Sequence, residues 1–133
     1  MTKMIAGIGT DIIECERIAG MIQRHGEHFT HRVFTENEIK YCFGHKLPEQ
    51  HFAGRWAAKE SVLKTLGTGW VSGISWKDVE VVSEVSGRPR IVLSGGAKKR
   101  ADDLGIAEIL VSISHCKSYA VATAFAVPVM PAI

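Results

Sequence analysis

The architecture of this chain depends on the run Arg55-Trp56-Ala57-Ala58-Lys59-Glu60-Ser61-Val62-Leu63-Lys64-Thr65-Leu66-Gly67-Thr68-Gly69. Helix-forming residues fill it up to Leu66, so we expect a helix that ends with Gly67 in the left-handed conformation. Pro48 suits the first turn of this helix, which would run over residues 48–66. Glu60 and Lys64 lie four residues apart on one face, in the order that suits a helical ion pair.

Local signals on either side of this helix predict the other elements. Thr35 and Glu38 have the spacing of a capping box, and Gly26 and Gly105 are expected to end helices. We predict strands over residues 4–8, 79–82, 89–93, 109–114 and 119–127, and helices over 14–24, after Thr35 and over 96–104. The segment 119–127 is nearly continuous in apolar residues, as expected for a strand covered on both faces. The prediction is an α+β fold without strict alternation of helix and strand.

Length and composition restrict the class of protein. A chain of 133 residues with 46% hydrophobic and 23% charged residues is typical of one soluble globular domain, which we expect to extend over 1–133. The net charge of +2 and the lack of a basic–aromatic platform argue against nucleic-acid binding. Three cysteines without C-x-x-C spacing fit a reducing compartment. We see no secretory signal and no apolar run that could cross a membrane, so we expect a cytoplasmic protein.

Two carboxylates are candidate metal ligands. Asp11 follows an apolar segment broken by glycines, and Glu60 lies on the predicted long helix. Two carboxylates from different elements, completed by waters and substrate phosphate oxygens, form the usual shell for Mg²⁺. A simpler interpretation makes Asp11 the cap of the next helix and Glu60 a surface partner of Lys64. The residues alone leave both interpretations open.

A lysine beside a glycine turn makes the end of the long helix a candidate phosphate site. The ammonium group of Lys64 and the backbone N–H groups of Gly67-Thr68-Gly69 could hold a phosphate together. The alternative is a plain helix cap. Because a helix C-terminus carries partial negative charge, phosphate binding here requires Lys64 and a metal ion to overcome that repulsion. The sequence is not a P-loop.

The run Ser112-Ile113-Ser114-His115 supplies another candidate group near the C-terminus. Its histidine could donate a hydrogen bond to a phosphate or transfer a proton. Ser114 and His115 point to opposite faces of a strand, so they are not expected to form a nucleophile–base dyad. Cys116 would be a nucleophile only with a stabilised thiolate.

Several side chains allow a surface or a core interpretation. Arg17 and Arg24 share one face of the first predicted helix, which suits an acidic partner helix or plain solvent. Gly26 interrupts the histidines that recur every three residues, so we interpret these as surface residues: His25, His28 and His31. Three apolar side chains at helical spacing are expected in the core: Phe52, Trp56 and Leu63.

With these segments in order, the chain resembles the holo-acyl-carrier-protein synthases, the small class of 4′-phosphopantetheinyl transferases. Three signatures match in order and spacing: Gly7-Ile8-Gly9-Thr10-Asp11 running on to Arg17-Ile18, residues 55–69, and Ser112-Ile113-Ser114-His115 with Tyr119-Ala120. Arg32-Val33-Phe34-Thr35 with Glu38 extends the likeness over almost the whole chain. The resemblance implies a single small domain, with one long central helix packed on an antiparallel sheet.

The resemblance also implies an activity in fatty acid biosynthesis. Such enzymes transfer 4′-phosphopantetheine from coenzyme A to a serine of apo-acyl carrier protein and release adenosine 3′,5′-bisphosphate. By this resemblance Asp11 and Glu60 hold Mg²⁺ (Mn²⁺ is not distinguished) against the pyrophosphate, and Lys64 adds positive charge in the transition state. The serine proton would go to Glu60 or to a metal-bound water; the sequence leaves both open.

Coenzyme A and partner binding follow from the same resemblance. Arg55 and His115, helped by Lys46, would hold the nucleotide phosphates, together with the turn Gly67-Thr68-Gly69. The family is typically trimeric, with each active site between neighbouring subunits, and the apolar last strand is a candidate interface. Acyl carrier proteins are acidic and helical, which makes Arg17 and Arg24 the expected docking residues.

Two other functions fit parts of the sequence. A non-catalytic module that binds nucleotide or coenzyme A would keep Lys64, Arg55 and His115 but would not need both carboxylates. A Cys–His hydrolase built on Cys116 would be blocked by a thiol reagent and indifferent to a chelator.

Overall fold

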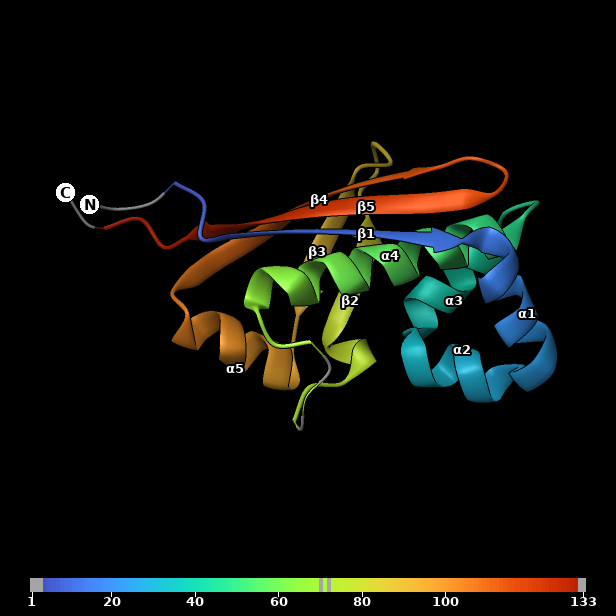
Figure 1. Cartoon of the computed structure of the whole chain (residues 1–133), viewed down its shortest axis with the longest axis horizontal. Helices are drawn as coiled ribbons and strands as arrows, with labels where there is room; N and C mark the ends of the chain where they lie inside the picture. The colour runs from blue at the N-terminus through green and yellow to red at the C-terminus, as the bar shows by residue number, and fades with distance from the viewer. Residues whose placement is uncertain (1–3, 70, 72, 132–133) are drawn as a thin grey trace.

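A long central helix, α4 (Pro48–Leu66), lies against a three-stranded antiparallel sheet (Figure 1). The computed structural model describes residues 4–69, 71 and 73–131. The strand order is β1-β5-β4, and the strands are β1 (Gly7–Glu14), β4 (Ile106–His115) and β5 (Tyr119–Pro128). This is the α+β arrangement expected from the sequence.

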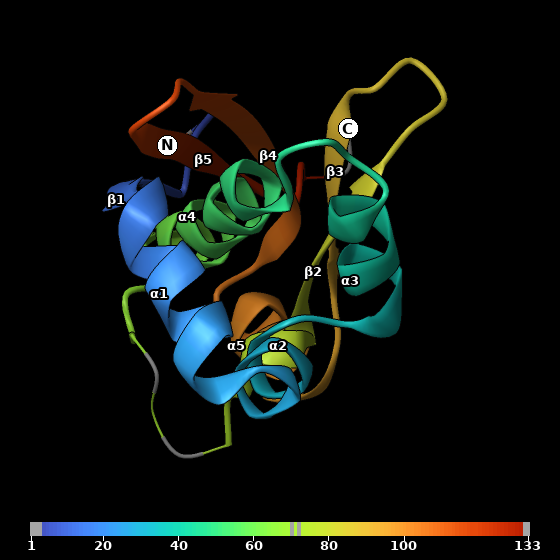
Figure 2. The same ribbon diagram turned by 90° about the vertical axis from the view of Figure 1, so that its right-hand side faces the viewer.

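The remaining elements pack around the other sides of α4. Three short helices precede it: α1 (Cys15–His25), α2 (Glu27–Val33) and α3 (Glu36–Phe43). A 3-10 turn (Trp76–Asp78), a hairpin of β2 (Val79–Ser83) and β3 (Pro89–Leu93), and α5 (Gly95–Asp103) follow it. Figure 2 shows the three-stranded sheet and the hairpin on different sides of α4. Within the described residues, no helix is long and apolar enough to cross a membrane.

The helix signals read from the sequence are confirmed. Pro48 occupies the first turn of α4, and Gly67 caps its end in the left-handed conformation with φ 71°. The capping box of Thr35 and Glu38 is formed in both directions. Gly26 ends α1. Each of these signals is local, so neighbouring residues alone determine it.

Three strand predictions need correction: the bounds of the first strand, the start of the fourth, and the burial of the last. The first strand extends over Gly7–Glu14, so Asp11 lies inside it and does not cap α1. The strand predicted to begin at residue 109 begins at Ile106. The last strand is covered on one face only, because Ala120 is buried while Val121 is 38% exposed. Pairing with neighbouring strands, rather than local composition, determines these features.

Small residues let α4 pack closely against the sheet. The inner face of β5 carries four buried alanines: Ala120, Ala122, Ala124 and Ala126. On β1, a Cβ added to Gly9 would lie 2.0 Å from the Ser61 carbonyl oxygen, and one added to Gly7 would lie 2.5 Å from that of Thr65. Only glycine therefore fits between these backbones.

A buried ion pair fixes the other side of α4. Lys59 and Glu38 are fully buried, with their charged atoms 2.8 Å apart. Glu38 also accepts hydrogen bonds from the backbone N–H groups of Thr35 and Val81, and Lys59 donates to the Val79 carbonyl. Because every partner is satisfied, this network ties α3, α4 and β2 together without leaving a buried charge unpaired.

We expect Gly9→Ala to destabilise the fold by about 1–3 kcal/mol, because the new methyl group must push β1 away from α4. Urea denaturation measures this change. Gly20→Ala in α1 is the control, since its Cβ would meet only the mobile end of Arg24 and alanine favours the helix. A Gly9→Ala protein as stable as the parent would contradict the close packing described here.

Candidate active site

The contact of β1 with α4 brings the first pair of predicted site residues together. β1 runs in the opposite direction to α4, because Gly7 lies against Thr65 and Gly9 against Ser61. Lys64 reaches back along this contact: its Nζ donates to the Thr10 carbonyl oxygen at 2.7 Å and lies 3.4 Å from Asp11 Oδ1. The predicted neighbourhood of carboxylate and lysine is therefore present within one chain.

The environment of Asp11 is partly desolvated. Burial raises the pKa of this carboxyl above its usual value, while the charge and hydrogen bond of Lys64 and the charge of Arg17 act in the opposite direction. Asp11 is thus a partly buried carboxylate that the positive charges of Lys64 and Arg17 already face. Such a carboxylate is well placed to accept a cation that offsets the cost of its burial.

Glu60 lies on the same stretch of α4. It is half-buried and directly precedes Ser61, whose carbonyl contacts Gly9. In the described residues no group of three or more His, Cys, Asp or Glu side chains could hold a metal. Mg²⁺ is commonly held by one or two carboxylates together with waters and substrate phosphates, so a site on Asp11 and Glu60 stays a prediction.

A second group of site residues surrounds the buried guanidinium of Arg55. This side chain is 5% exposed, donates to Ser83 Oγ at 2.9 Å and lies 3.8 Å from the centre of the Tyr41 ring. Its Nε has no hydrogen-bond partner in the described part of the chain, and none of the ion pairs found there supplies it with a carboxylate. A buried cation with an unsatisfied donor indicates an anion site.

A cavity of about 130 Å³ lies beside Arg55. Its lining includes Tyr41, His51, Ser83 and His115. Pockets that enclose a whole drug-sized ligand have volumes of about 300–1,000 Å³. This cavity therefore suits one anionic group of a larger ligand.

Two histidines, His51 and His115, line this cavity, and a third, His45, packs on His51 from outside the lining. His45 stacks on His51 with ring centres 3.8 Å apart, and His51 meets His115 edge to face at 5.1 Å. Burial lowers the pKa of His51 to about 4, and the charges of His45, His115 and Arg55 act in the same direction. The predicted pair Arg55 and His115 is thus brought together, and His51 joins it.

The two groups lie on opposite sides of α4. Nine residues separate Arg55 from Lys64, which is about two and a half turns and about 13 Å along the axis. The side chain of Lys64 contacts β1, whereas that of Arg55 contacts α3 and β2. One copy of the chain therefore does not bring all predicted site residues to one place.

Two further predicted parts of the site lie just outside α4. The turn Gly67-Thr68-Gly69 follows its last residue, and Lys46 precedes its first turn. Gly67 and Gly69 both have positive φ, and Thr68 Oγ1 is buried without a hydrogen-bond partner in the described residues. Lys46 is exposed in the loop before α4, next to His45. Cys116 is also exposed, and hydrogen bonds from the backbone N–H groups of Ser118 and Tyr119 lower the pKa of its thiol.

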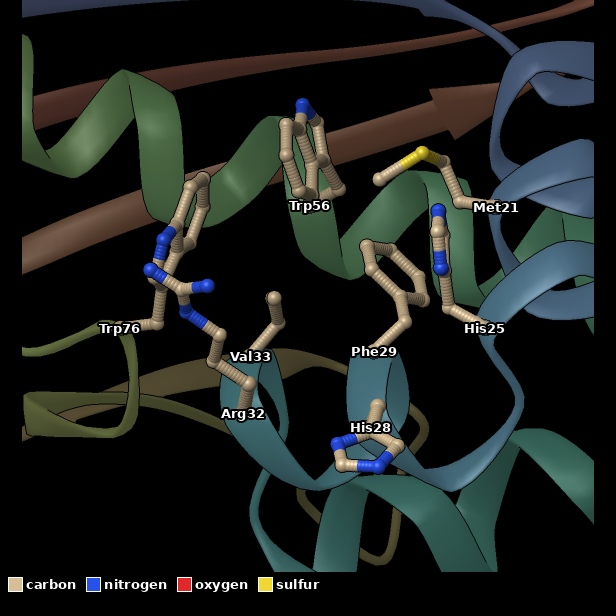
Figure 3. A pocket seen from close by; sticks show the side chains of 8 residues that line it. All are labelled: Met21, His25, His28, Phe29, Arg32, Val33, Trp56 and Trp76. Atoms are coloured by element: carbon tan, nitrogen blue, oxygen red, sulfur yellow. The ribbon is translucent and has the colours of Figure 1, made fainter.

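A pocket beside α1 was not predicted. Figure 3 shows aromatic and apolar side chains converging on it from α1, α2, α4 and the 3-10 turn, with basic side chains around them. Its volume is about 320 Å³, and its lining is Met21, His25, His28, Phe29, Arg32, Val33, Trp56 and Trp76. Trp56 is partly buried, packs against the core and stacks on Trp76 at 4.4 Å, so its prediction as a core residue is confirmed only in part, while Phe52 and Leu63 are fully core.

The predicted docking arginines, Arg17 and Arg24, are not among the residues that line this pocket. Both side chains are exposed on α1, and Arg24 lies against the Met21 sulfur at 3.6 Å. The sequence signal for the pocket was weak, because its lining comes from four elements and no single period connects them. His51 was missed for the same reason: it has no motif of its own, and only the fold places it beside Arg55 and His115.

Comparison with known proteins agrees with this fold. Residues 7–124 match the sequence model of the 4′-phosphopantetheinyl transferase superfamily. The holo-[acyl-carrier-protein] synthase of Protochlamydia amoebophila is 49% identical over 124 residues, which cover 93% of this chain and 98% of that protein.

Solved structures of such synthases are similar as well. That of Neisseria meningitidis has a TM-score of 0.83 and 30% identity, covering 92% of this chain and 98% of that one. The Bacillus anthracis synthase, solved in complex with CoA (3′,5′-ADP), has a TM-score of 0.78 and 36% identity, covering 95% and 99%.

The sequence match and the fold together define a 4′-phosphopantetheinyl transferase. Within that superfamily, the chain belongs to the holo-[acyl-carrier-protein] synthase family. The resemblance read from the sequence is confirmed.

Proposed function

We propose that this chain transfers 4′-phosphopantetheine from coenzyme A to a serine of apo-acyl carrier protein. The observation that carries the proposal is the buried guanidinium of Arg55, which lacks a carboxylate in the described residues and borders a cavity with His115. It suits a phosphate of the nucleotide part of coenzyme A. The single domain over 1–133 belongs to this proposal, as does a cytoplasmic setting.

Asp11 and Glu60 are the proposed ligands of Mg²⁺. When bound, the metal would polarise the attacked phosphoryl group and neutralise the leaving group. The partial burial of Asp11 favours a cation beside it, and both carboxylates offer the oxygen atoms that Mg²⁺ prefers. A coenzyme A module without catalysis would not need both carboxylates, so their presence supports the enzyme over that alternative.

The chain's own charges support the transfer step. A bond forms between the serine Oγ and the phosphorus that carries pantetheine, and the bond from that phosphorus to the bridging oxygen breaks. Adenosine 3′,5′-bisphosphate leaves with the electron pair. Lys64, held at Thr10 and Asp11, keeps an ammonium group beside the site where this negative charge develops. Glu60 is the carboxylate that this chain offers to the serine proton.

The reaction is tested by the intact mass of apo-acyl carrier protein after incubation with this protein, coenzyme A and Mg²⁺. We expect a gain of about 340 Da, the new covalent group on serine, which EDTA abolishes. Asp11→Asn should lower the rate by on the order of 10²–10³-fold, because it removes a charge that acts at the reacting phosphate.

Asp103→Asn is the matched control, since Asp103 pairs with Lys99 on the exposed surface of α5. Coenzyme A binding without any mass gain would support a regulatory module. A thiol-sensitive hydrolysis that tolerates EDTA would support the hydrolase built on Cys116.

We further propose that the active enzyme is a homotrimer, with the site completed between copies. The two groups on opposite sides of α4 are the main support, because a neighbour's Arg55 group could face the Asp11 group of the first copy. The outer face of the sheet supplies an apolar surface for contact. Its exposed side chains are Ile8, Ile12, Leu110, Tyr119 and Val121.

Val121→Glu should convert the trimer to monomers, because it places a charge in the middle of this apolar surface. Sedimentation velocity measures the change in mass. Val85→Glu introduces the same charge at a fully exposed position in the β2–β3 turn and should leave the mass unchanged. A parent protein that sediments as a monomer would reject the proposal.

Acyl carrier protein is proposed to dock on α1. Arg17 and Arg24 offer positive charge to its acidic helix, and the adjoining pocket offers Met21, Phe29 and Trp56 to an apolar side chain. Charge at the rim would mainly accelerate association, whereas the pocket would slow dissociation.

Arg24→Glu should therefore raise the KM for carrier protein several-fold and leave coenzyme A binding nearly intact. Steady-state kinetics at varied carrier protein, repeated at high salt, measures this effect. Lys98→Glu also inverts a positive charge, one that pairs with Asp102 on α5 at the other end of the molecule from α1 (Figure 1), and serves as the control. An unchanged KM in Arg24→Glu would remove the docking role.

A further inference from the structure

The cavity beside Arg55 is surrounded by one cation and by histidines that become positive when they are protonated. His51 on α4 faces Tyr41 of α3, His45 of the loop before α4, Arg55 one turn along its own helix, and His115 of β4. No carboxylate lines this cavity among the described residues. Its ionisable groups therefore repel one another whenever they are protonated together.

His51 lies at the centre of this repulsion. Its ring is in contact with both other histidine rings, at 3.8 Å and 5.1 Å between ring centres. The low pKa of about 4 has burial as its largest cause, followed by the charges of the surrounding cations. In the empty cavity at neutral pH, His51 is neutral and its ring serves as a spacer between His45 and His115.

An anion reverses the sign of the field in this cavity. A negative group within about 4–6 Å commonly raises the pKa of a neighbouring base by about 1–3 units. Arg55 lines the cavity and has an unsatisfied Nε, so a phosphate bound to its guanidinium there would lie beside the His51 ring as well. The cost that keeps His51 neutral is then offset by the ligand.

We infer that His51 is a further ligand-binding residue of this enzyme, which takes up a proton as a phosphate of coenzyme A or of adenosine 3′,5′-bisphosphate enters the cavity. Binding of the negative ligand thus makes His51 positively charged. This inference rests on the proposed function, because it takes the bound group to be a phosphate of that substrate.

The sign of the pH dependence follows from linkage. The pKa of His51 is lower in the free protein than in the complex, so binding takes up a proton and strengthens as the pH falls. For a rise of about two units, from about 4 to about 6, binding takes up about half a proton at pH 6. The affinity then increases about tenfold from pH 8 to pH 5 through this residue alone.

Titration calorimetry with adenosine 3′,5′-bisphosphate tests the inference. Measurements at pH 6 in two buffers of different ionisation enthalpy give the number of protons taken up. The parent protein is compared with His51→Phe, which keeps an aromatic ring and removes the titrating nitrogens, and with His51→Gln in case the larger ring disturbs the stack. His31→Gln, whose histidine pairs with Glu36 on the surface, is the control.

We expect the parent and His31→Gln to take up about half a proton more than either His51 variant. The affinity ratio of the parent to His51→Phe should increase about tenfold from pH 8 to pH 5. This ratio cancels the titration of the ligand's own phosphates, which have a second pKa near 6.

Equal proton uptake and a constant affinity ratio would overturn the role of His51 and leave the proposed function intact, provided the parent still transfers phosphopantetheine. A parent protein that neither binds adenosine 3′,5′-bisphosphate nor transfers phosphopantetheine would instead overturn the proposed function. Titration with 3′-AMP and 5′-AMP identifies the phosphate concerned, because only the ligand whose phosphate enters the cavity should show uptake that depends on His51.

Discussion

The close approach of α4 to β1 is the constraint on which the rest of the structure depends. Two glycines of β1 lie where a methyl group would collide with the helix backbone, and the alanine row of β5 continues the same flat surface. Because the two backbones are this close, a side chain of α4 can reach the strand directly. Lys64 therefore meets Thr10 and Asp11, and the carboxylate proposed to bind the metal is positioned by packing rather than by a flexible loop.

The same helix has a different environment on its other side. There the buried pair of Lys59 and Glu38 fixes α3 and β2, which in turn supply Tyr41 and Ser83 to Arg55. A buried pair of this kind adds little net stability, but removing one partner is costly, so it restricts how α3 and β2 can be placed. The anion cavity thus depends on a structural ion pair one turn further along the helix.

The sequence predicted those parts of the fold and site that local physics determines. A proline at the first turn, a capping box and a left-handed glycine act within one turn, so Pro48, Thr35 and Gly67 were interpreted correctly. The start of β1 and the open face of β5 depend on strand pairing and on what lies outside the chain. His51 illustrates the limit: nothing near it in the sequence indicates that its ring lies between two other histidines.

Placing the two groups on opposite sides of one helix has a chemical consequence. The cavity proposed to bind phosphate disfavours the protonation of His51 while it is empty, whereas the partly desolvated carboxylate of Asp11 favours a cation, and a single small pocket would let the two neutralise each other. With α4 between them, Arg55 keeps its free donor and Asp11 keeps its affinity for a cation. If the sites are completed between copies, a ligand that spans them supplies the negative group that the Arg55 cavity lacks, whereas Lys64 already faces Asp11 in the free chain.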